Sequence, residues 1–358
     1  MTVSAPVRPL EQAAPGPTPK PATSNAVLEV EDLRVHYVTR FGHKIQAVDG
    51  VSFSLKQGEI LGVAGESGCG KTTLVSGCMG LYIPPLFHTS GDVRIDGKSI
   101  VGMTLEQNRK EVLGQKIAMI PQGALNSLNP TRKIKDMAAD MILSHDESAD
   151  KKTINDRLRE RFTRIGLDAE HVLNAYPVEL PAGTKQRCVI GISTLLNPKV
   201  VVADEPTSAL DVSTQKAVIR LLFELMDQEI ISSMLFITHE LPLLRHVSSS
   251  IAVMYAGQFV EYGTTEQVIF EGRQPYSRAL MGSMLSAEPG QKRRKPVAIE
   301  GAPPKLDKPI PGCRFAERCP VAQPDCKVTE QVLRVVAGRQ VRCKYADTEV
   351  IEQVGGGL

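Results

Sequence analysis

Apolar and polar residues follow two different patterns along the chain. Residues 28–33 and 51–55 alternate between apolar and polar, which is the period of a strand with one buried face. Residues 59–64, 199–203 and 234–238 are almost wholly apolar, as expected for strands of a parallel sheet that is buried on both faces. The two patterns together predict an α/β fold.

The stretch at residues 123–198 is different, because charged segments that favour helix dominate it and prolines interrupt it. It is expected to form a helical subdomain within the α/β unit. A run rich in Pro, Ala, Thr and Ser opens the chain and predicts disorder. We expect five parts: a disordered tail (1–26), an α/β domain (27–286), a linker (287–312), a small Cys-bearing C-terminal module (313–345) and a flexible tail (346–358).

Composition limits the classes of partner. The chain has 358 residues, of which 42% are hydrophobic, and its 42 Lys and Arg nearly balance its 40 Asp and Glu. This balance gives no general electrostatic reason to expect nucleic acid as a partner. The sequence has no apolar run of about 18 residues and no signal-peptide pattern at its start. We therefore expect a cytoplasmic protein that reaches a membrane only through a partner.

A glycine-rich segment follows the first apolar run and fits the pattern G-x-x-x-x-G-K-[ST]. Its residues are Gly65, Glu66, Ser67, Gly68, Cys69, Gly70, Lys71 and Thr72, and Thr73 continues into a predicted helix. Glycines let successive backbone N–H groups point at phosphate oxygens, and the helix N-terminus adds a positive dipole. A chance match in a glycine-rich turn is the alternative, but the preceding strand and following helix argue against it.

Three side chains of this segment have predicted roles. Lys71 is expected to contact the β- and γ-phosphates of a nucleotide, and Thr72 to offer its hydroxyl to Mg²⁺. Cys69 is expected to be a small filler whose thiol pKa is lowered by the helix N-terminus.

Two carboxylates end the apolar run at 199–203. Asp204 and Glu205 are expected at the carboxyl edge of the sheet, where open α/β folds bind ligands. Asp204 would hold Mg²⁺, and Glu205 would activate or orient the attacking water. An acidic strand-to-loop turn without function is the alternative, and it is disfavoured by the phosphate-binding motif upstream.

With these motifs in this order, residues 27–345 resemble the ATP-binding-cassette ATPases. The resemblance implies that Gln122 contacts Mg²⁺ and links the nucleotide to a membrane partner, and that His239 contacts the γ-phosphate. It identifies Asp211 with the family's D-loop. Tyr37 is the best candidate for the aromatic side chain that stacks on adenine, with Phe41 as a rival.

Two segments and the Cys-bearing tail narrow the resemblance to the oligopeptide, dipeptide and nickel importer branch. The segments are Asn126–Pro130 and Pro275–Leu280. The branch implies uptake of peptides or a related solute by two different ATPase subunits on two membrane-spanning permease subunits. An extracytoplasmic solute-binding protein delivers the solute, and the ATPases lie on the cytoplasmic face of the membrane.

One motif departs from the family pattern. The signature normally reads Leu-Ser-Gly-Gly-x-x-Gln, and here Pro181 and Ala182 replace its serine and first glycine, whereas Gly183 and Gln186 are kept. Proline has neither the hydroxyl nor a backbone N–H. Because the family places each ATP between one subunit's phosphate loop and the other's signature, we expect a heterodimer in which the composite site completed by Pro181 and Ala182 is weak.

Four cysteines fall close together near the C-terminus: Cys313, Cys319, Cys326 and Cys343. Four thiolates suit zinc or an iron–sulfur cluster, although paired C-x-x-C spacing is lacking. The resemblance to the importer branch favours a [4Fe-4S] cluster over zinc. Scattered thiols without a metal are the remaining alternative.

The sequence is compatible with two other functions. A soluble cassette ATPase that acts on DNA or ribosomes is disfavoured by the single phosphate loop and the absence of sustained heptads. A mainly regulatory nucleotide-binding subunit is compatible with the altered signature, but the presence of Glu205 and His239 weighs against it.

Overall fold

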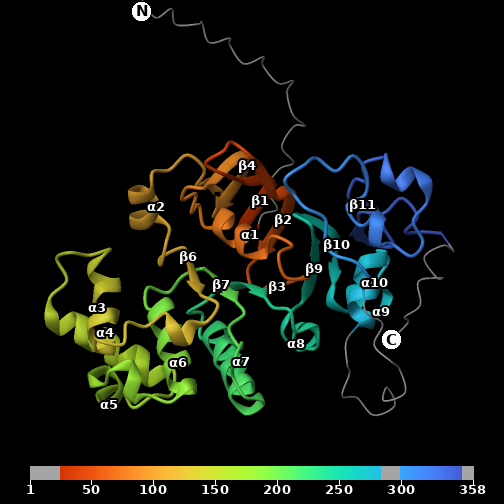
Figure 1. The fold of residues 1–358 in the computed structure, drawn as a ribbon. Coiled ribbons are helices and arrows are strands. Elements are labelled where there is room, and N and C mark those ends of the chain that lie inside the picture. Colours follow the sequence, from red (N-terminus) through yellow and green to blue (C-terminus); the bar gives the residue numbers. More distant parts are fainter. Residues whose placement is uncertain (1–24, 284–298, 349–358) are drawn as a thin grey trace, which may run out of the picture.

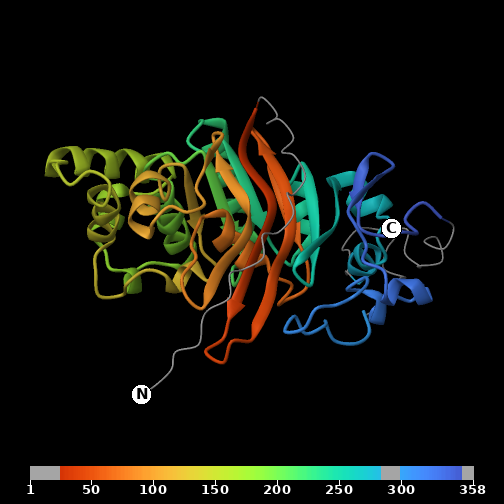
Figure 2. The same ribbon diagram turned by 90° about the horizontal axis from the view of Figure 1, so that it is seen from above.

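Two β-sheets lie at the centre of the computed structural model, which describes residues 25–283 and 299–348 (Figure 1). Nearly all of the predicted disordered tail, much of the predicted linker and most of the C-terminal tail fall outside these residues. The helical part (within residues 123–198) lies at one end of the sheets and the C-terminal segment (residues 299–348) at the other, as Figure 2 shows from above.

The smaller sheet is antiparallel, with strand order β2-β1-β4-β5. Its strands are β1 (Ala26–Val38), β2 (Lys44–Lys56), β4 (Leu86–Ile95) and β5 (Lys98–Ser99). The two alternating stretches of the sequence lie in β1 and β2, where Val35 pairs with Val48 and both side chains are fully buried. The period-2 pattern therefore gave the correct secondary structure, with one face of each strand in the core.

The larger sheet has the order β11-β12-β10-β9-β3-β8-β7-β6, and its five strands from β9 to β6 are parallel. The parallel strands are β3 (Ile60–Ala64), β6 (Ile117–Ile120), β7 (Val200–Asp204), β8 (Ser233–Ile237) and β9 (Ser250–Tyr255). The antiparallel edge consists of β10 (Gln258–Thr264), β11 (Arg334–Val336) and β12 (Arg339–Val341).

Both faces of the parallel strands are buried. In β3, Leu61 and Val63 join the core shared with the antiparallel sheet and the helix α1 (Lys71–Cys78). Ile60 and Ala64 face the core on the other side. Alternate side chains point to opposite faces of a strand, so double burial explains why the sequence is apolar at consecutive positions here.

Helices cover the second face of the large sheet and its antiparallel edge. They are α7 (Val212–Asp227), α8 (Leu241–Val247), α9 (Thr265–Glu271) and α10 (Pro275–Gly282). The short helix α2 (Leu105–Glu111) begins with a capping box made by Thr104 and Gln107, which satisfies two backbone N–H groups at its start. None of the helices among the described residues is long and apolar enough to cross a bilayer.

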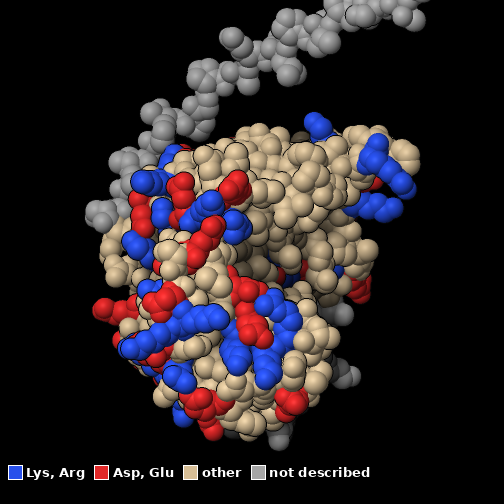
Figure 3. Space-filling view, turned by 90° about the vertical axis from the view of Figure 1, so that its left-hand side faces the viewer, with Lys and Arg blue, Asp and Glu red and all other residues tan. Residues whose placement is uncertain are grey.

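A helical unit with its own core occupies most of the predicted stretch 123–198. Its helices are α3 (Ile134–Leu143), α4 (Lys151–Arg164), α5 (Ala169–Asn174) and α6 (Ala182–Ser193), with short 3₁₀ turns η1 (Ala124–Asn126) and η2 (Pro177–Glu179). Phe162 lies in the centre of this core with no exposed surface. Figure 3 faces this end of the molecule, where basic and acidic side chains are interspersed over the surface.

The Cys-bearing segment does not stand apart as a small module, because it extends the main sheet. Strand β12 pairs with β10 through Glu261 and Tyr262. The segment also includes the 3₁₀ turns η3 (Ala316–Arg318) and η4 (Pro324–Lys327). Phe315, just before η3, lies 5.3 Å from both Tyr255 and Tyr276, measured between ring centroids. The C-terminal segment is thus packed into the core of the α/β domain.

This packing predicts the effect of removing the Phe315 ring. Phe315 is 2% exposed, so Phe315→Ala should lower the free energy of unfolding by about 3–5 kcal/mol through lost burial and a cavity. Val335→Ala in the same segment is the control, since Val335 is 75% exposed. Urea unfolding of both variants measures the difference, and equal stabilities would show that the segment is not part of the core.

Candidate nucleotide site

The glycine-rich loop lies between the end of β3 and the start of α1, as predicted. Its backbone approaches neighbouring strands too closely for side chains: a Cβ on Gly65 would lie 2.2 Å from the Met254 carbonyl oxygen, and one on Gly70 would lie 2.2 Å from that of Ala47. Gly70 also has φ 110°, a conformation that residues with a Cβ rarely adopt. These two glycines are therefore required by the shape of the loop.

Lys71 and Cys69 lie on the inside of this loop. The Lys71 ammonium donates to the backbone oxygens of Gly65 at 2.6 Å and Glu66 at 3.0 Å. Cys69 is 4% exposed, and burial raises the pKa of its thiol. The predicted lowering of that pKa was wrong, because the loss of hydration outweighs the charge of Lys71 and the helix N-terminus.

The two predicted carboxylates come together at the carboxyl end of β7. Asp204 is the last residue of the strand and is 2% exposed. Burial, followed by the charge of Glu205, raises its pKa to about 6. Glu205 turns away with φ 48°, a left-handed backbone that costs about 1–2 kcal/mol for a residue with a side chain. Both carboxylates nevertheless line the same cavity.

Glu205 is held by side chains from the two neighbouring strand ends. Gln122, which follows β6, donates from Nε2 to Oε2 of Glu205 at 3.1 Å. His239, which follows β8, has Nδ1 3.0 Å from Oε1. Because β6, β7 and β8 are adjacent in the sheet, three motifs that are far apart in the sequence meet at one carboxylate.

These residues surround an open cavity of about 840 Å³. The predicted residues that line it are Tyr37, Ser67, Gly68, Gly70, Lys71, Thr72, Thr73, Gln122, Asp204, Glu205 and His239. The Tyr37 hydroxyl also lies 3.2 Å from the Thr73 hydroxyl. Phe41 does not line the cavity and is 76% exposed, so the geometry favours Tyr37 as the aromatic contact.

The oxygen atoms in this cavity fit Mg²⁺. Oδ2 of Asp204 is buried without a hydrogen-bond partner, and Thr72 lines the same cavity as this carboxyl group. Gln122 adds an amide oxygen. A hard cation prefers such ligands, and Mg²⁺ bound here would neutralise charge on nucleotide phosphates.

The predicted signature residues lie elsewhere. Pro181 is the N-cap of α6, and it and Ala182 are exposed at the start of that helix. Gly183 follows them, and Gln186 is buried and donates to the Pro206 carbonyl oxygen at 2.7 Å. None of the four lines the cavity. Asp211 does not line it either, since its carboxylate caps α7 by accepting from the backbone N–H groups of Ser213 and Thr214.

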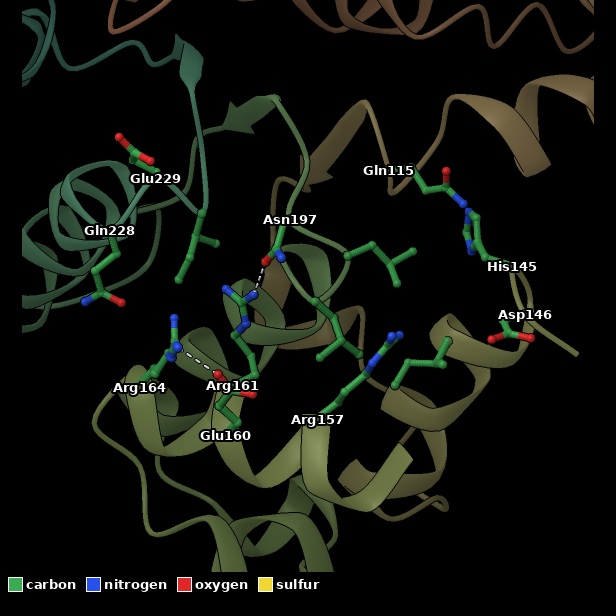
Figure 4. A pocket seen from close by; sticks show the side chains of 14 residues that line it. Gln115, His145, Asp146, Arg157, Glu160, Arg161, Arg164, Asn197, Gln228 and Glu229 are labelled. Carbon is green, nitrogen blue, oxygen red and sulfur yellow. Dashed lines mark hydrogen bonds and ion pairs between the residues drawn. The ribbon is translucent and has the colours of Figure 1, made fainter. Parts of the chain in front are cut away.

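Another cavity, of about 660 Å³, lies at the opposite edge of the sheet (Figure 4). Gln115, Asn197 and Glu229 line it just before β6, β7 and β8 begin, and Arg157 and Arg161 line it from α4. Arg161 donates to Asn197, and burial lowers its pKa to about 10. No predicted site residue lines this cavity, so it is separate from the nucleotide site.

The four tail cysteines line one narrow cavity of the C-terminal segment. Burial raises the pKa of Cys319 to about 12 and that of Cys343 to about 11, and it also raises the pKa of Cys313. Among residues 25–283 and 299–348, no group of three or more His, Cys, Asp and Glu is arranged to hold a metal ion. The structure therefore brings the thiols together without confirming the predicted metal site.

The sequence reasoning missed residues of the C-terminal segment that reach the nucleotide site. Leu306 lines the cavity beside Ile45 and Ala47. Arg318 binds Glu66 of the glycine-rich loop, and the Tyr276 hydroxyl accepts from the Glu66 backbone N–H at 2.9 Å. No local pattern indicated Leu306 or Arg318, because their contacts depend on how the end of the chain folds back. Tyr276 belongs to the segment Pro275–Leu280 noted in the sequence, but nothing there predicted its contact with the loop.

Comparison with known proteins agrees with this geometry. Residues 48–208 match the family described as ABC transporter, and residues 260–326 match the one described as oligopeptide/dipeptide transporter, C-terminal region. The oligopeptide transport ATP-binding protein OppF of Salmonella typhimurium is 36% identical over 330 residues, covering 90% of this chain and 96% of that protein. The chain belongs to the ABC transporter family.

Other relatives of this ABC transporter ATPase are equally similar. The dipeptide transport ATP-binding protein DppD of Caldanaerobacter subterraneus subsp. tengcongensis is 37% identical over 302 residues, 84% of this chain and 91% of that protein. Among solved structures, the dimeric post-hydrolysis state of the ATP-binding cassette MJ0796 superposes with a TM-score of 0.57 at 23% identity, over 66% of this chain and 98% of that one. This likeness to a solved structure supports the cassette fold.

The position of Glu205 in this ABC ATPase predicts the effect of neutralising it. Glu205→Gln keeps the size of the side chain but removes its basicity, so ATP hydrolysis should fall by about 10²–10⁴-fold while ATP binding persists. Glu240→Gln is the matched control, because Glu240 does not line the nucleotide cavity. Hydrolysis by the assembled transporter and nucleotide binding by the chain are the two measurements. Undiminished turnover in Glu205→Gln would exclude this role.

Proposed function

We propose that this chain is one of two non-identical ATPase subunits of an importer that takes up oligopeptides, dipeptides or a related solute. The observation that carries the proposal is a complete phosphate, Mg²⁺ and carboxylate constellation on one surface, with the altered signature outside it. OppF and DppD, the relatives described above, are named for oligopeptide and dipeptide transport. Two permease subunits and an extracytoplasmic binding protein would complete the assembly at the cytoplasmic face of the membrane.

The positions of the residues support the following roles. Lys71 and the backbone N–H groups of the loop bind the phosphates, and Tyr37 contacts the adenine ring. Thr72, Gln122 and Asp204 would hold Mg²⁺. Glu205 orients and deprotonates the attacking water, and His239 stands beside it where the γ-phosphate is transferred.

The signature residues Pro181 to Gly183, with Gln186 behind them, would face the ATP of the partner ATPase. Pro181 begins α6 without a side-chain cap, so neither a hydroxyl nor a proline N–H is offered to a phosphate there. Two copies of this chain would form two sites with this defect. A partner with an intact signature would form one competent site with Lys71 and Glu205 of this chain, and the other site would bind ATP but hydrolyse it slowly.

The deciding experiment compares ATP hydrolysis by the chain alone with hydrolysis by the complex of both ATPases, the permeases and the peptide-loaded binding protein. We expect turnover only in the complex. Pro181→Ser with Ala182→Gly should raise it, because the second site gains a phosphate donor. Pro181→Ala with Ala182→Gly is the control, because it removes the proline and restores the glycine without supplying a hydroxyl. Brisk hydrolysis by the isolated chain would argue against the heterodimer, and nucleotide binding without any contribution to turnover would indicate a regulatory subunit.

We also propose that Cys313, Cys319, Cys326 and Cys343 ligate a [4Fe-4S] cluster, with zinc as the alternative. Their convergence on one cavity from positions spread over about thirty residues supports this. Each thiol of such a cluster binds a different iron, so the four cysteines of a cluster lie further apart than the four ligands of one zinc ion do.

Metal analysis of protein purified without oxygen tests the cluster. We expect about four irons per chain and a broad absorbance in the visible blue, both lost in Cys319→Ser, with Cys188→Ser as a control because Cys188 lies in the helical core. Stoichiometric zinc without iron would replace the cluster by the alternative, and neither metal would leave four structural thiols.

A further inference from the structure

Arg318 uses every donor of its guanidinium group in one set of contacts. Nη1 donates to Oε2 of Glu66 at 2.7 Å and to the Tyr255 hydroxyl at 3.2 Å. Nη2 donates to Oε1 of Glu66 at 3.0 Å and to the Ile299 carbonyl oxygen at 3.3 Å, and Nε to that of Glu300 at 2.9 Å. Arginine has five N–H donors, and here all five are satisfied in a side chain that is 5% exposed.

The partner of this arginine is part of the glycine-rich loop. Glu66 is the second residue of that loop, and its backbone oxygen also accepts from Lys71. An unpaired carboxylate at this position would repel the phosphates of a nucleotide, since like charges destabilise each other most in partly buried places. The bidentate ion pair with Arg318 neutralises the charge of Glu66 and fixes the direction of the Glu66 side chain.

Arg314 supports the loop from the other side. It donates from Nη1 to the Ala256 carbonyl oxygen at 2.5 Å and from Nη2 to Asp49. Gly257, which follows Ala256, donates its backbone N–H to the Cys69 carbonyl oxygen at 2.8 Å. The Gly257 carbonyl oxygen accepts from the Asp49 backbone N–H at 2.8 Å. Arg314 therefore fixes the turn at Ala256 and Gly257, and this turn is hydrogen-bonded to Cys69 of the glycine-rich loop.

We propose that Arg318 and Arg314 are positioning residues for the phosphate loop, so that the C-terminal segment sets the affinity of this chain for Mg-ATP. Arg314 directly follows Cys313 and Arg318 directly precedes Cys319. Any change that moves these two cysteines displaces the arginines and, through them, both sides of the loop. The inference rests on the proposed use of this loop for ATP.

The test measures ATP affinity of the full chain by fluorescence of a nucleotide analogue and by calorimetry. Lys71→Ala defines loss of the site: if the unaltered chain binds no ATP, the proposed function itself fails. Arg318→Ala should weaken ATP binding about tenfold, the size expected for one well-placed charged pair. Arg318→Lys should weaken it less, because lysine keeps the charge but does not bind both carboxylate oxygens in parallel.

The double variant Glu66→Gln with Arg318→Ala separates positioning from folding. It should recover part of the lost affinity, because the repelling carboxylate is gone although the arginine is still missing. Arg334→Ala is the matched control, since Arg334 pairs with Asp347 in the same segment away from the loop, and it should bind ATP normally. Unchanged affinity in Arg318→Ala overturns the inference. So does a loss that persists in the double variant, because the unpaired Glu66 carboxylate would then not be its cause.

Discussion

Burial of the parallel strands on both faces is the constraint on which the rest of this molecule depends. Residues such as Val63, Val201 and Phe236 have no access to water on either side of the sheet. A polar side chain within these strands would lose its hydration without gaining a partner. Chemistry is therefore confined to the strand ends, and the carboxyl edge collects the glycine-rich loop, Gln122, the two carboxylates and His239.

The loops at this edge adopt conformations that an unconstrained chain avoids. Glu205 has a left-handed backbone, and Gly70 lies where no side chain fits beside Ala47. Such strain persists only where the surrounding structure over-determines it. Here that support comes from hydrogen bonds to Glu205 by its neighbours and from the strands on either side of the loop. A site that is held in place in this way before ligand binding loses less entropy when the ligand binds.

Much of this arrangement could be predicted from the sequence because the signals are local. Strands β1, β2, β3, β7 and β8 gave clear periodic or apolar runs, and the glycine-rich segment follows its strand directly. Other features depended on tertiary contacts. The pKa of Cys69 was misjudged because burial cannot be read from its neighbours in sequence. The Cys-bearing segment joins the main sheet because β12 pairs with β10. A strand of only three residues is too short to give a periodic pattern that would predict this pairing. The pairing of Arg318 with Glu66 likewise has no local signature.

The brace between Glu66 and Arg318 joins positions 252 residues apart. Ribosomes make the amino-terminal end first, so the glycine-rich loop leaves the ribosome long before the arginine that steadies it has been synthesised. A nascent chain can thus form its helices and most of the sheet while its nucleotide site is still unbraced. If the proposed role of Arg318 holds, the loop gains its full support, and with it its full affinity for nucleotide, only after Arg318 has left the ribosome.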